Sequence, residues 1–137
     1  MSPTKVARLG LAVAVVGGVM ALAGQSFAGL KREEAVSITT SGTSQVAVGS
    51  VGTARASTDG NQEIGCTTKG LSSGAAVSCR AVSATNQVLS CTSGNSGLAL
   101  AAAAIGSNSR LYIVVSSTGE CTQLDVSNRS SYKPIVP

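Results

Sequence analysis

The stretch Leu111-Tyr112-Ile113-Val114-Val115 is the strongest strand signal in this chain. Four of its five residues are β-branched or aromatic, which favours a strand over a helix. Asn108-Ser109 stands before it and residues 116–119 follow it, and such polar, glycine-containing clusters mark turns. The chain is therefore predicted to turn back after this strand, so that the next stretch pairs with it as a hairpin.

Apolar and polar residues alternate in that next stretch, which is typical of a strand with one face buried and the other in water. The residues expected on the buried face are Thr122, Leu124 and Val126. Those expected on the wet face are Cys121, Gln123 and Asp125.

A second hairpin is predicted upstream, where a turn at residues 71–74 would pair residues 62–68 with residues 75–83. A further turn at Thr85-Asn86 would return the chain once more. The residues expected on one face of the middle strand and of its next partner are Val77, Cys79 and Ala81, and Leu89 and Cys91. Nearer the N-terminus, Val46, Val48 and Val51 alternate, so residues 45–55 predict a strand interrupted by glycines.

One short helix is predicted over residues 97–105, with Ser96 as its N-cap and Gly106 just past its end. An apolar stripe runs along it, formed by Leu98, Ala101, Ala102 and Ile105. A helix this short is marginal alone in water, so it is expected to pack on a sheet. A membrane-surface helix is the alternative, but the basic flank that anionic lipid attracts is missing.

These elements predict an α+β fold, a small antiparallel sheet built as hairpin, helix, hairpin, with the helix on one face and two disulfides. The domain is expected over residues 45–134. A flexible leader at residues 29–44 would precede it, because that stretch is polar apart from a few residues, and an extended tail at residues 135–137 would follow.

Residues 1–28 carry the pattern of a signal peptide. Lys5 and Arg8 precede an apolar run at residues 9–24, and Ser26-Phe27-Ala28 places small residues where a signal peptidase cuts. A membrane anchor is the alternative, but this run falls short of the roughly 20 residues that span a bilayer. We therefore expect cleavage after Ala28 and a secreted or periplasmic chain with no membrane association.

The four cysteines, Cys66, Cys79, Cys91 and Cys121, all follow the predicted cleavage site. An even number of cysteines in an oxidising compartment predicts two structural disulfides. The gaps of 12, 11 and 29 residues between them contain no Cys-x-x-Cys pair, so neither a metal site nor a redox-active pair is expected.

Three pairings of the four cysteines are possible, and strand geometry ranks them without choosing one. The predicted hairpin brings Cys66 opposite or nearly opposite Cys79, which favours Cys66–Cys79 together with Cys91–Cys121. The rival pair is Cys79–Cys91, across the turn at Thr85-Asn86. Because large aromatic residues are nearly absent from the core, the disulfides are expected to supply much of the stability.

Several motifs of the chain are distinctive as a set: Gly49-Ser50-Val51-Gly52-Thr53-Ala54-Arg55, Ile64-Gly65-Cys66, Val77-Ser78-Cys79-Arg80-Ala81, Leu89-Ser90-Cys91, Gly119-Glu120-Cys121-Thr122-Gln123-Leu124-Asp125-Val126-Ser127-Asn128 and Tyr132-Lys133-Pro134. They resemble a group of small exported bacterial proteins with four spaced cysteines. The resemblance implies export and disulfides, and it implies no activity, ligand or catalytic residue. Members of that group tend to carry several aromatic residues after the helix, where this chain has only Tyr112.

The composition excludes several kinds of site. The chain has no histidine, which rules out Ser-His-Asp and Cys-His catalysis and histidine-containing metal sites. Cleavage would remove Lys5 and Arg8 and lower the net charge from +4 to +2, and the remaining basic residues are scattered, so no nucleic-acid partner is expected. The acidic residues left, all expected as solvated surface, are Glu33, Glu34, Asp59, Glu63, Glu120 and Asp125.

We therefore predict no catalytic residue, no cofactor and no metal, and a structural or binding domain that is not an enzyme. It would act by surface or self-association through its sheet edges, with a cell-surface component or another copy as partner. The alternative is a secreted hydrolase or toxin-like enzyme that uses acidic residues, or a serine with Lys69 or Lys133. A small-ligand binder would need an apolar pocket between helix and sheet.

Overall fold

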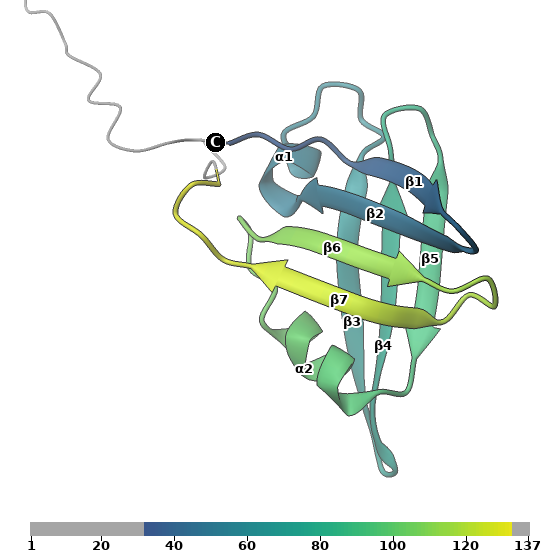
Figure 1. Ribbon diagram of the computed structural model, residues 1–137. Helices are drawn as coiled ribbons and strands as arrows, with labels where there is room; N and C mark the ends of the chain where they lie inside the picture. The colour runs from purple at the N-terminus through teal and green to yellow at the C-terminus, as the bar shows by residue number, and fades with distance from the viewer. Residues whose placement is uncertain (1–31, 133–137) are drawn as a thin grey trace, which may run out of the picture.

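The apolar stretch at residues 111–115 forms an interior strand of the protein. A computed structural model describes residues 32–132, and the predicted signal peptide (residues 1–28) and tail (residues 135–137) lie outside them (Figure 1). The described part consists of seven strands and two short helices. All the strand pairs in its two sheets are antiparallel.

The first sheet has four strands in the order β1-β2-β6-β7. Its strands are β1 (Ser37–Ser41), β2 (Ser44–Ser50), β6 (Arg110–Val115) and β7 (Cys121–Ser127). β6 therefore has a neighbour on both sides, and its burial alternates, with Leu111, Ile113 and Val115 inside. The predicted C-terminal hairpin, β6 with β7, is confirmed.

The second sheet has three strands in the order β3-β4-β5. Its strands are β3 (Glu63–Leu71), β4 (Gly74–Val82) and β5 (Val88–Ser93). Both predicted turns are confirmed, because Leu71 and Gly74 end the β3–β4 pairing and Asn86, with φ of 61°, lies between β4 and β5. The predicted inward face of β4 and β5 is also confirmed, since every residue assigned to it is buried.

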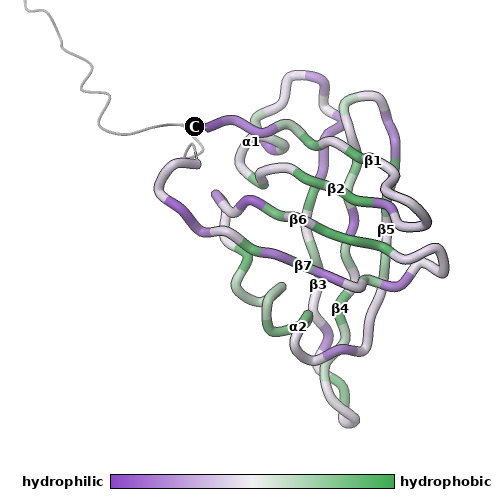
Figure 2. The backbone as a smooth tube through the Cα atoms, in the orientation of Figure 1, coloured by the Kyte–Doolittle hydropathy of each residue, from purple (hydrophilic) through white to green (hydrophobic). Residues whose placement is uncertain are grey.

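The two sheets pack against each other, and Figure 1 shows the strands of one running across those of the other. The shared core joins the inner faces of β4, β5 and β6, as in a sandwich whose sheets cross. The expectation of one sheet covered by a helix is therefore wrong: a second sheet covers the first. The fold is strand-rich, so α+β describes it only loosely. Figure 2 shows hydrophobic residues along the middle of β2 and β6.

The first helix, α1 (Val51–Arg55), interrupts the strand predicted over residues 45–55. The Ser50 hydroxyl accepts a hydrogen bond from the Thr53 amide at 3.1 Å, which caps the helix and ends β2. Val51 thus belongs to a helix, and the prediction is wrong beyond residue 50.

The second helix, α2 (Ser96–Ala103), confirms the predicted helix with a shifted start. Asn95, and not Ser96, is the N-cap, because its side-chain oxygen accepts from the amides of Gly97 and Leu98 at 2.8 and 3.3 Å. The predicted stripe faces the core, with Ala102 buried and Leu98, Ala101 and Ile105 partly buried against it. Ala99, which is not part of the predicted stripe, is buried beside them. The helix contacts β3 and β4 of one sheet and β7 of the other, so it closes one end of the space between the sheets.

A β-bulge changes the faces expected for β7. Val115 pairs with Cys121 while the neighbouring Val114 pairs with Gln123, so Thr122 is an extra residue. Cys121 and Leu124 both point inward as a result, and Thr122 is exposed. The expected wet position of Cys121 and buried position of Thr122 are wrong for this reason.

The predicted flexible leader is wrong over residues 37–44, because β1 occupies residues 37–41 and pairs with β2. Val36, just before β1, is only 4% exposed and belongs to the core. Its Cα and a methyl group occupy the space where Gly49 carries no side chain. Few apolar residues mark this segment, but two of them, Val36 and Ile38, pack inward.

Candidate functional site

The cysteines form the favoured pairs. Cys66–Cys79 joins β3 to β4, and Cys91–Cys121 joins β5 to β7 and so links the two sheets. No free thiol remains. Two disulfides are compatible with an oxidising compartment.

The two cysteines of the rival pair, Cys79 and Cys91, also lie next to each other. Cys66, Cys79 and Cys91 stand in register on three adjacent strands, with Cys79 in the middle. The Sγ atoms of Cys79, Cys91 and Cys121 all lie within 4.8 Å of one another. Metal ions bind thiolates, and each of these sulfur atoms is held in a disulfide, so the cluster in this form is structural.

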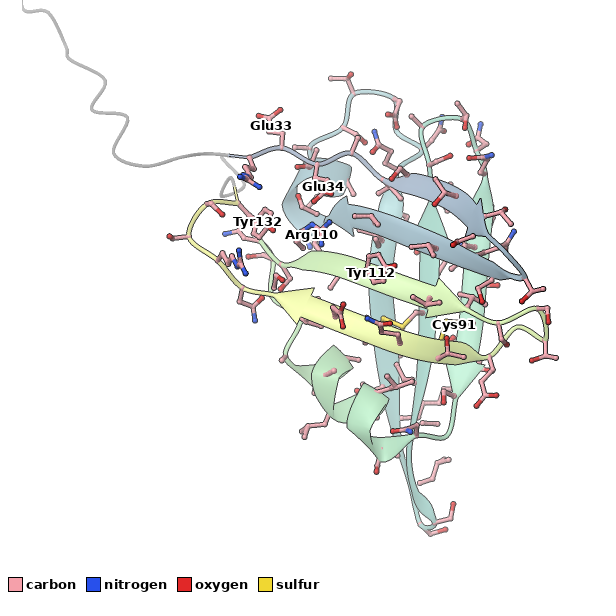
Figure 3. The ribbon with its side chains drawn as sticks, viewed as in Figure 1. Glu33, Glu34, Cys91, Arg110, Tyr112 and Tyr132 are labelled. Atoms are coloured by element: carbon pink, nitrogen blue, oxygen red, sulfur yellow. A yellow bond between two sulfur atoms is a disulfide. The ribbon has the colours of Figure 1, made fainter. Side chains whose placement is uncertain are left out.

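The N-terminal segment before β1 is tied to the C-terminal end of the described chain and to the first sheet. The Arg32 amide donates to the Ser131 carbonyl at 2.7 Å, and Arg32 forms a parallel bridge with Tyr132. Two residues on, the Glu34 carboxylate accepts two hydrogen bonds from the Arg110 guanidinium, at 2.5 and 3.1 Å (Figure 3). The bonded Glu34 raises the pKa of Arg110 above its usual range, so this cation stays charged.

The turn after α1 holds the next part of the same segment. The Val36 amide donates to the Gln62 side-chain oxygen at 2.8 Å, and the Gln62 side-chain nitrogen donates to the Asp59 carboxylate at 2.6 Å. Hydrogen bonds from the Gln62 side chain and the Asn61 amide hold the pKa of Asp59 below its ordinary value of 3.8. Asp59 thus orders a turn, and Gln62 connects that turn to β1. Neither composition nor periodicity predicts this link, because single side chains join the two segments.

The other acids considered as catalytic candidates are spread over the surface. Glu63 pairs with Arg80 at 3.1 Å between exposed side chains, and Asp125 accepts from the Gln123 side chain at 2.9 Å. The partners of Glu34, Asp59, Glu63 and Asp125 are therefore cations, amides or hydroxyls, whereas a glycosidase places two carboxyl groups on either side of one cleft.

Lys69, the lysine of the alternative hydrolase hypothesis, lines an open groove of about 580 Å³ between the β3–β4 hairpin and the β6–β7 turn. Its lining residues are Lys69, Ala76, Val77, Ser78, Thr92, Ser93, Gly94, Thr118, Gly119 and Glu120. An activated serine would lie within hydrogen-bond reach of its base. Among residues 32–132, no hydrogen bond joins Lys69 to Ser78 or Ser93, and Lys133 lies outside the described residues.

A smaller groove of about 300 Å³ lies between α2 and the β3–β4 hairpin, where a small-ligand binder would need its apolar pocket. Most of its lining residues are exposed, and Leu100 on its rim is 76% exposed. This is a surface groove and not an enclosed cavity.

The four sheet edges differ in how they are protected. β3 carries Glu63 and Lys69, and β7 carries Asp125 and a bulge, which are features that discourage pairing with another strand. β5 is covered where the Thr92 amide donates to the Gly119 carbonyl at 3.3 Å. β1, with the sequence Ser-Ile-Thr-Thr-Ser, has no charge and no proline, and it has a strand neighbour on one side only.

The outer face of the four-stranded sheet carries an apolar strip beside this edge. Ala47 pairs with Ile113 on the inner face, so the neighbouring Val46 and Val48 of β2 lie on the outer face with Tyr112 and Val114 of β6. Figure 3 shows Tyr112 on that face. The alternating Val46 and Val48 therefore lie next to β1 on the outer face of the sheet, where Val46 is buried by its neighbours and Val48 is half-buried.

Comparison with protein-family models, with curated proteins and with solved structures finds no match to this chain. Within residues 32–132, neither helix is long and apolar enough to cross a membrane.

Proposed function

We propose that this protein is a secreted or periplasmic assembly domain, not an enzyme, in which β1 of one copy pairs antiparallel with β1 of a second copy. The observation that carries this proposal is the edge of β1, which is uncharged and uncovered. The other three sheet edges carry charges, a bulge or a covering turn. The two disulfides and the predicted signal peptide support the location outside the cytosol.

The sequence of β1 suits pairing with itself. A two-fold axis at Thr39 would place Thr39 opposite its own copy, Ser37 opposite Ser41 and Ile38 opposite Thr40. No like charges would face each other across the pair, and threonine side chains directly opposite each other stabilise the pairing of two strands. The outer strip of Val46 and Tyr112 would then continue across the joined sheet. Because β1 has only five residues, the association is expected to be weak and dependent on concentration.

The test introduces a charge at this edge. Thr39→Lys places a lysine at the centre of the pair, and Thr67→Lys makes the same change on β3, an edge that already carries Lys69. Light scattering after size-exclusion chromatography, over a range of concentrations, should show the native mass rising toward a dimer. Thr67→Lys should behave likewise, and Thr39→Lys should stay monomeric with unchanged circular dichroism. A native protein that is monomeric up to millimolar concentration, or a dimer that survives Thr39→Lys, would contradict the proposal.

A further inference from the structure

Cys79 has a cysteine directly opposite it on both neighbouring strands. The Cα atoms of Cys66 and Cys79 are 4.0 Å apart, which identifies them as the closely spaced, non-hydrogen-bonded type of antiparallel pair. Cys79 therefore directs its backbone hydrogen bonds to β5 and forms the other type of pair with Cys91. The Cα atoms in such a pair are about 5.5 Å apart, which lies inside the range for a disulfide.

The sulfur atoms are close enough for exchange. The Sγ atom of Cys79 lies within 4.8 Å of both sulfur atoms of the Cys91–Cys121 disulfide. If Cys79 lost its bond to Cys66, the new thiolate would already stand beside a second disulfide. Thiolates attack disulfides through mixed disulfides, so this proximity favours an internal transfer.

Access from solvent is unequal among the four residues. Cys79, Cys91 and Cys121 are 1%, 3% and 2% exposed, whereas Cys66 is only partly buried and belongs to β3, an edge strand of its sheet. An external thiol would therefore reach the sulfur of Cys66 before any other. The thiolate released by that attack is the buried one, Cys79.

We propose that these four cysteines form a thiol–disulfide exchange site, in which a dithiol reacts at Cys66 and the Cys66–Cys79 and Cys91–Cys121 disulfides are replaced by Cys79–Cys91. This inference is independent of the proposed pairing of β1. The co-reactant class is a dithiol, either a small molecule or the active site of a thiol oxidoreductase.

The steps balance in atoms and electrons. A thiolate of the dithiol attacks Cys66 Sγ, forms a mixed disulfide there and releases the Cys79 thiolate. Cys79 attacks Cys91 Sγ, the Cys79–Cys91 bond forms, and Cys121 leaves as a thiolate that takes up a proton. The second thiol of the dithiol then resolves the mixed disulfide, and Cys66 leaves and is protonated. The dithiol is oxidised to its disulfide, and the protein gains two electrons and two protons as thiols at Cys66 and Cys121.

The exchange changes what the disulfides hold together. Cys91–Cys121 links the two sheets, whereas Cys79–Cys91 lies within the three-stranded sheet. Reaction at the partly exposed Cys66 would thus release the covalent link between the sheets, although that link is itself buried. The long gaps between cysteines in the sequence conceal this arrangement, because strand register and not sequence spacing brings the sulfur atoms together.

The primary test uses the full, oxidised protein and one molar equivalent of dithiothreitol. After acid quenching and alkylation, a peptide map should show alkylated Cys66 and Cys121 together with a Cys79–Cys91 link. Alkylation of Cys66 and Cys79 with Cys91–Cys121 intact would overturn the proposal. So would alkylation that begins at Cys91 and Cys121, or no alkylation of the folded protein.

Two single variants supply a matched control. Cys66→Ser leaves Cys79 unpaired beside Cys91–Cys121, and Cys79→Ser leaves Cys66 unpaired outside the cluster of three. In a glutathione redox buffer, the Cys66→Ser variant should contain both the Cys79–Cys91 and the Cys91–Cys121 disulfide, with neither isomer more than about tenfold in excess of the other. Cys79→Ser should hold Cys91–Cys121 alone. Equal rearrangement in both variants would indicate general scrambling and would overturn the assigned role of Cys79.

Discussion

Gly49 illustrates, at the scale of single residues, how a missing side chain fixes the N-terminal segment. A Cβ at this position would lie 3.0 Å from both the Cα and the Cγ2 of Val36. The backbone conformation of Gly49 does not require glycine, so the close approach of Val36 is the reason for glycine here. Two side chains complete the attachment of this segment. Gln62 accepts a hydrogen bond from the Val36 amide and donates one to the Asp59 carboxylate.

We expect Gly49→Ala to lower the free energy of unfolding by about 1–3 kcal/mol, because the added methyl group overpacks a buried contact. Gly65→Ala is the matched control, since it lies in a strand and a Cβ there meets nothing within 4 Å. That control should change the stability by less than about 0.5 kcal/mol. Denaturant unfolding of both variants measures the difference, and equal stabilities would mean that Val36 does not pack closely on Gly49.

The Asp59 turn should respond to acid. Its carboxyl has a lowered pKa in the folded chain, so the charged form favours folding. This contribution is complete above the ordinary value of 3.8 and is lost as the pH falls through the lower folded value. The difference in unfolding free energy between the native protein and Asp59→Ala should therefore be constant above about pH 5 and shrink below 3.8. A difference that grows on acidification would show the opposite sign of the shift.

At the scale of elements, the sequence predicts where the strands lie better than it predicts what they face. The β-branched content and the turns of the sequence predict the strands β4, β5 and β6, and the apolar faces predicted for β4 and β5 are confirmed as buried. The bulge at Thr122 was not predictable, because alternation alone cannot show where one extra residue enters a strand. β1 was missed although Ile38, Thr39 and Thr40 favour strands, since the polar surroundings indicated a leader.

Substitutions at the start of α2 test which residue is its N-cap. Asn95→Ala removes the acceptor for the amides of Gly97 and Leu98 and should cost about 1 kcal/mol of stability. Ser96→Ala, at the residue that the sequence favoured as cap, should stay within about 0.5 kcal/mol of the native protein. Thermal or denaturant unfolding compares the two. A larger loss from Ser96→Ala would restore Ser96 as the cap.

For the whole molecule, the unpredicted feature is the division into two sheets. β2 pairs with β6, more than fifty residues later in the sequence, and local patterns carry no information about partners so far apart. The sequence favours the observed disulfide pairing because Cys66–Cys79 depends on one hairpin, and the second pair then follows, but the turn at Thr85-Asn86 leaves Cys79–Cys91 open as a rival. The partly buried Glu34–Arg110 ion pair could not be predicted from the sequence, because it joins residues 76 positions apart.

The two disulfides should differ in their contribution to stability. They close loops with sequence separations of 13 and 30 residues, for which chain entropy gives about 3 and about 3.7 kcal/mol. Replacing both cysteines of Cys91–Cys121 with alanine should therefore destabilise the protein more than the same change at Cys66–Cys79. Two buried side chains are also lost in the first case. Unfolding under non-reducing conditions measures both, and a larger loss for Cys66–Cys79 would contradict this order.

The parallel bridge between Arg32 and Tyr132 brings the start and the finish of the described chain to one point. A short linker could therefore fuse residue 32 to residue 132 and leave the sheets undisturbed, with new termini opened at Ser72 and Ser73, in the exposed tip of the β3–β4 hairpin. For the same reason, the domain could be inserted into a surface loop of a host protein as a cassette, and β1 would stay free to pair.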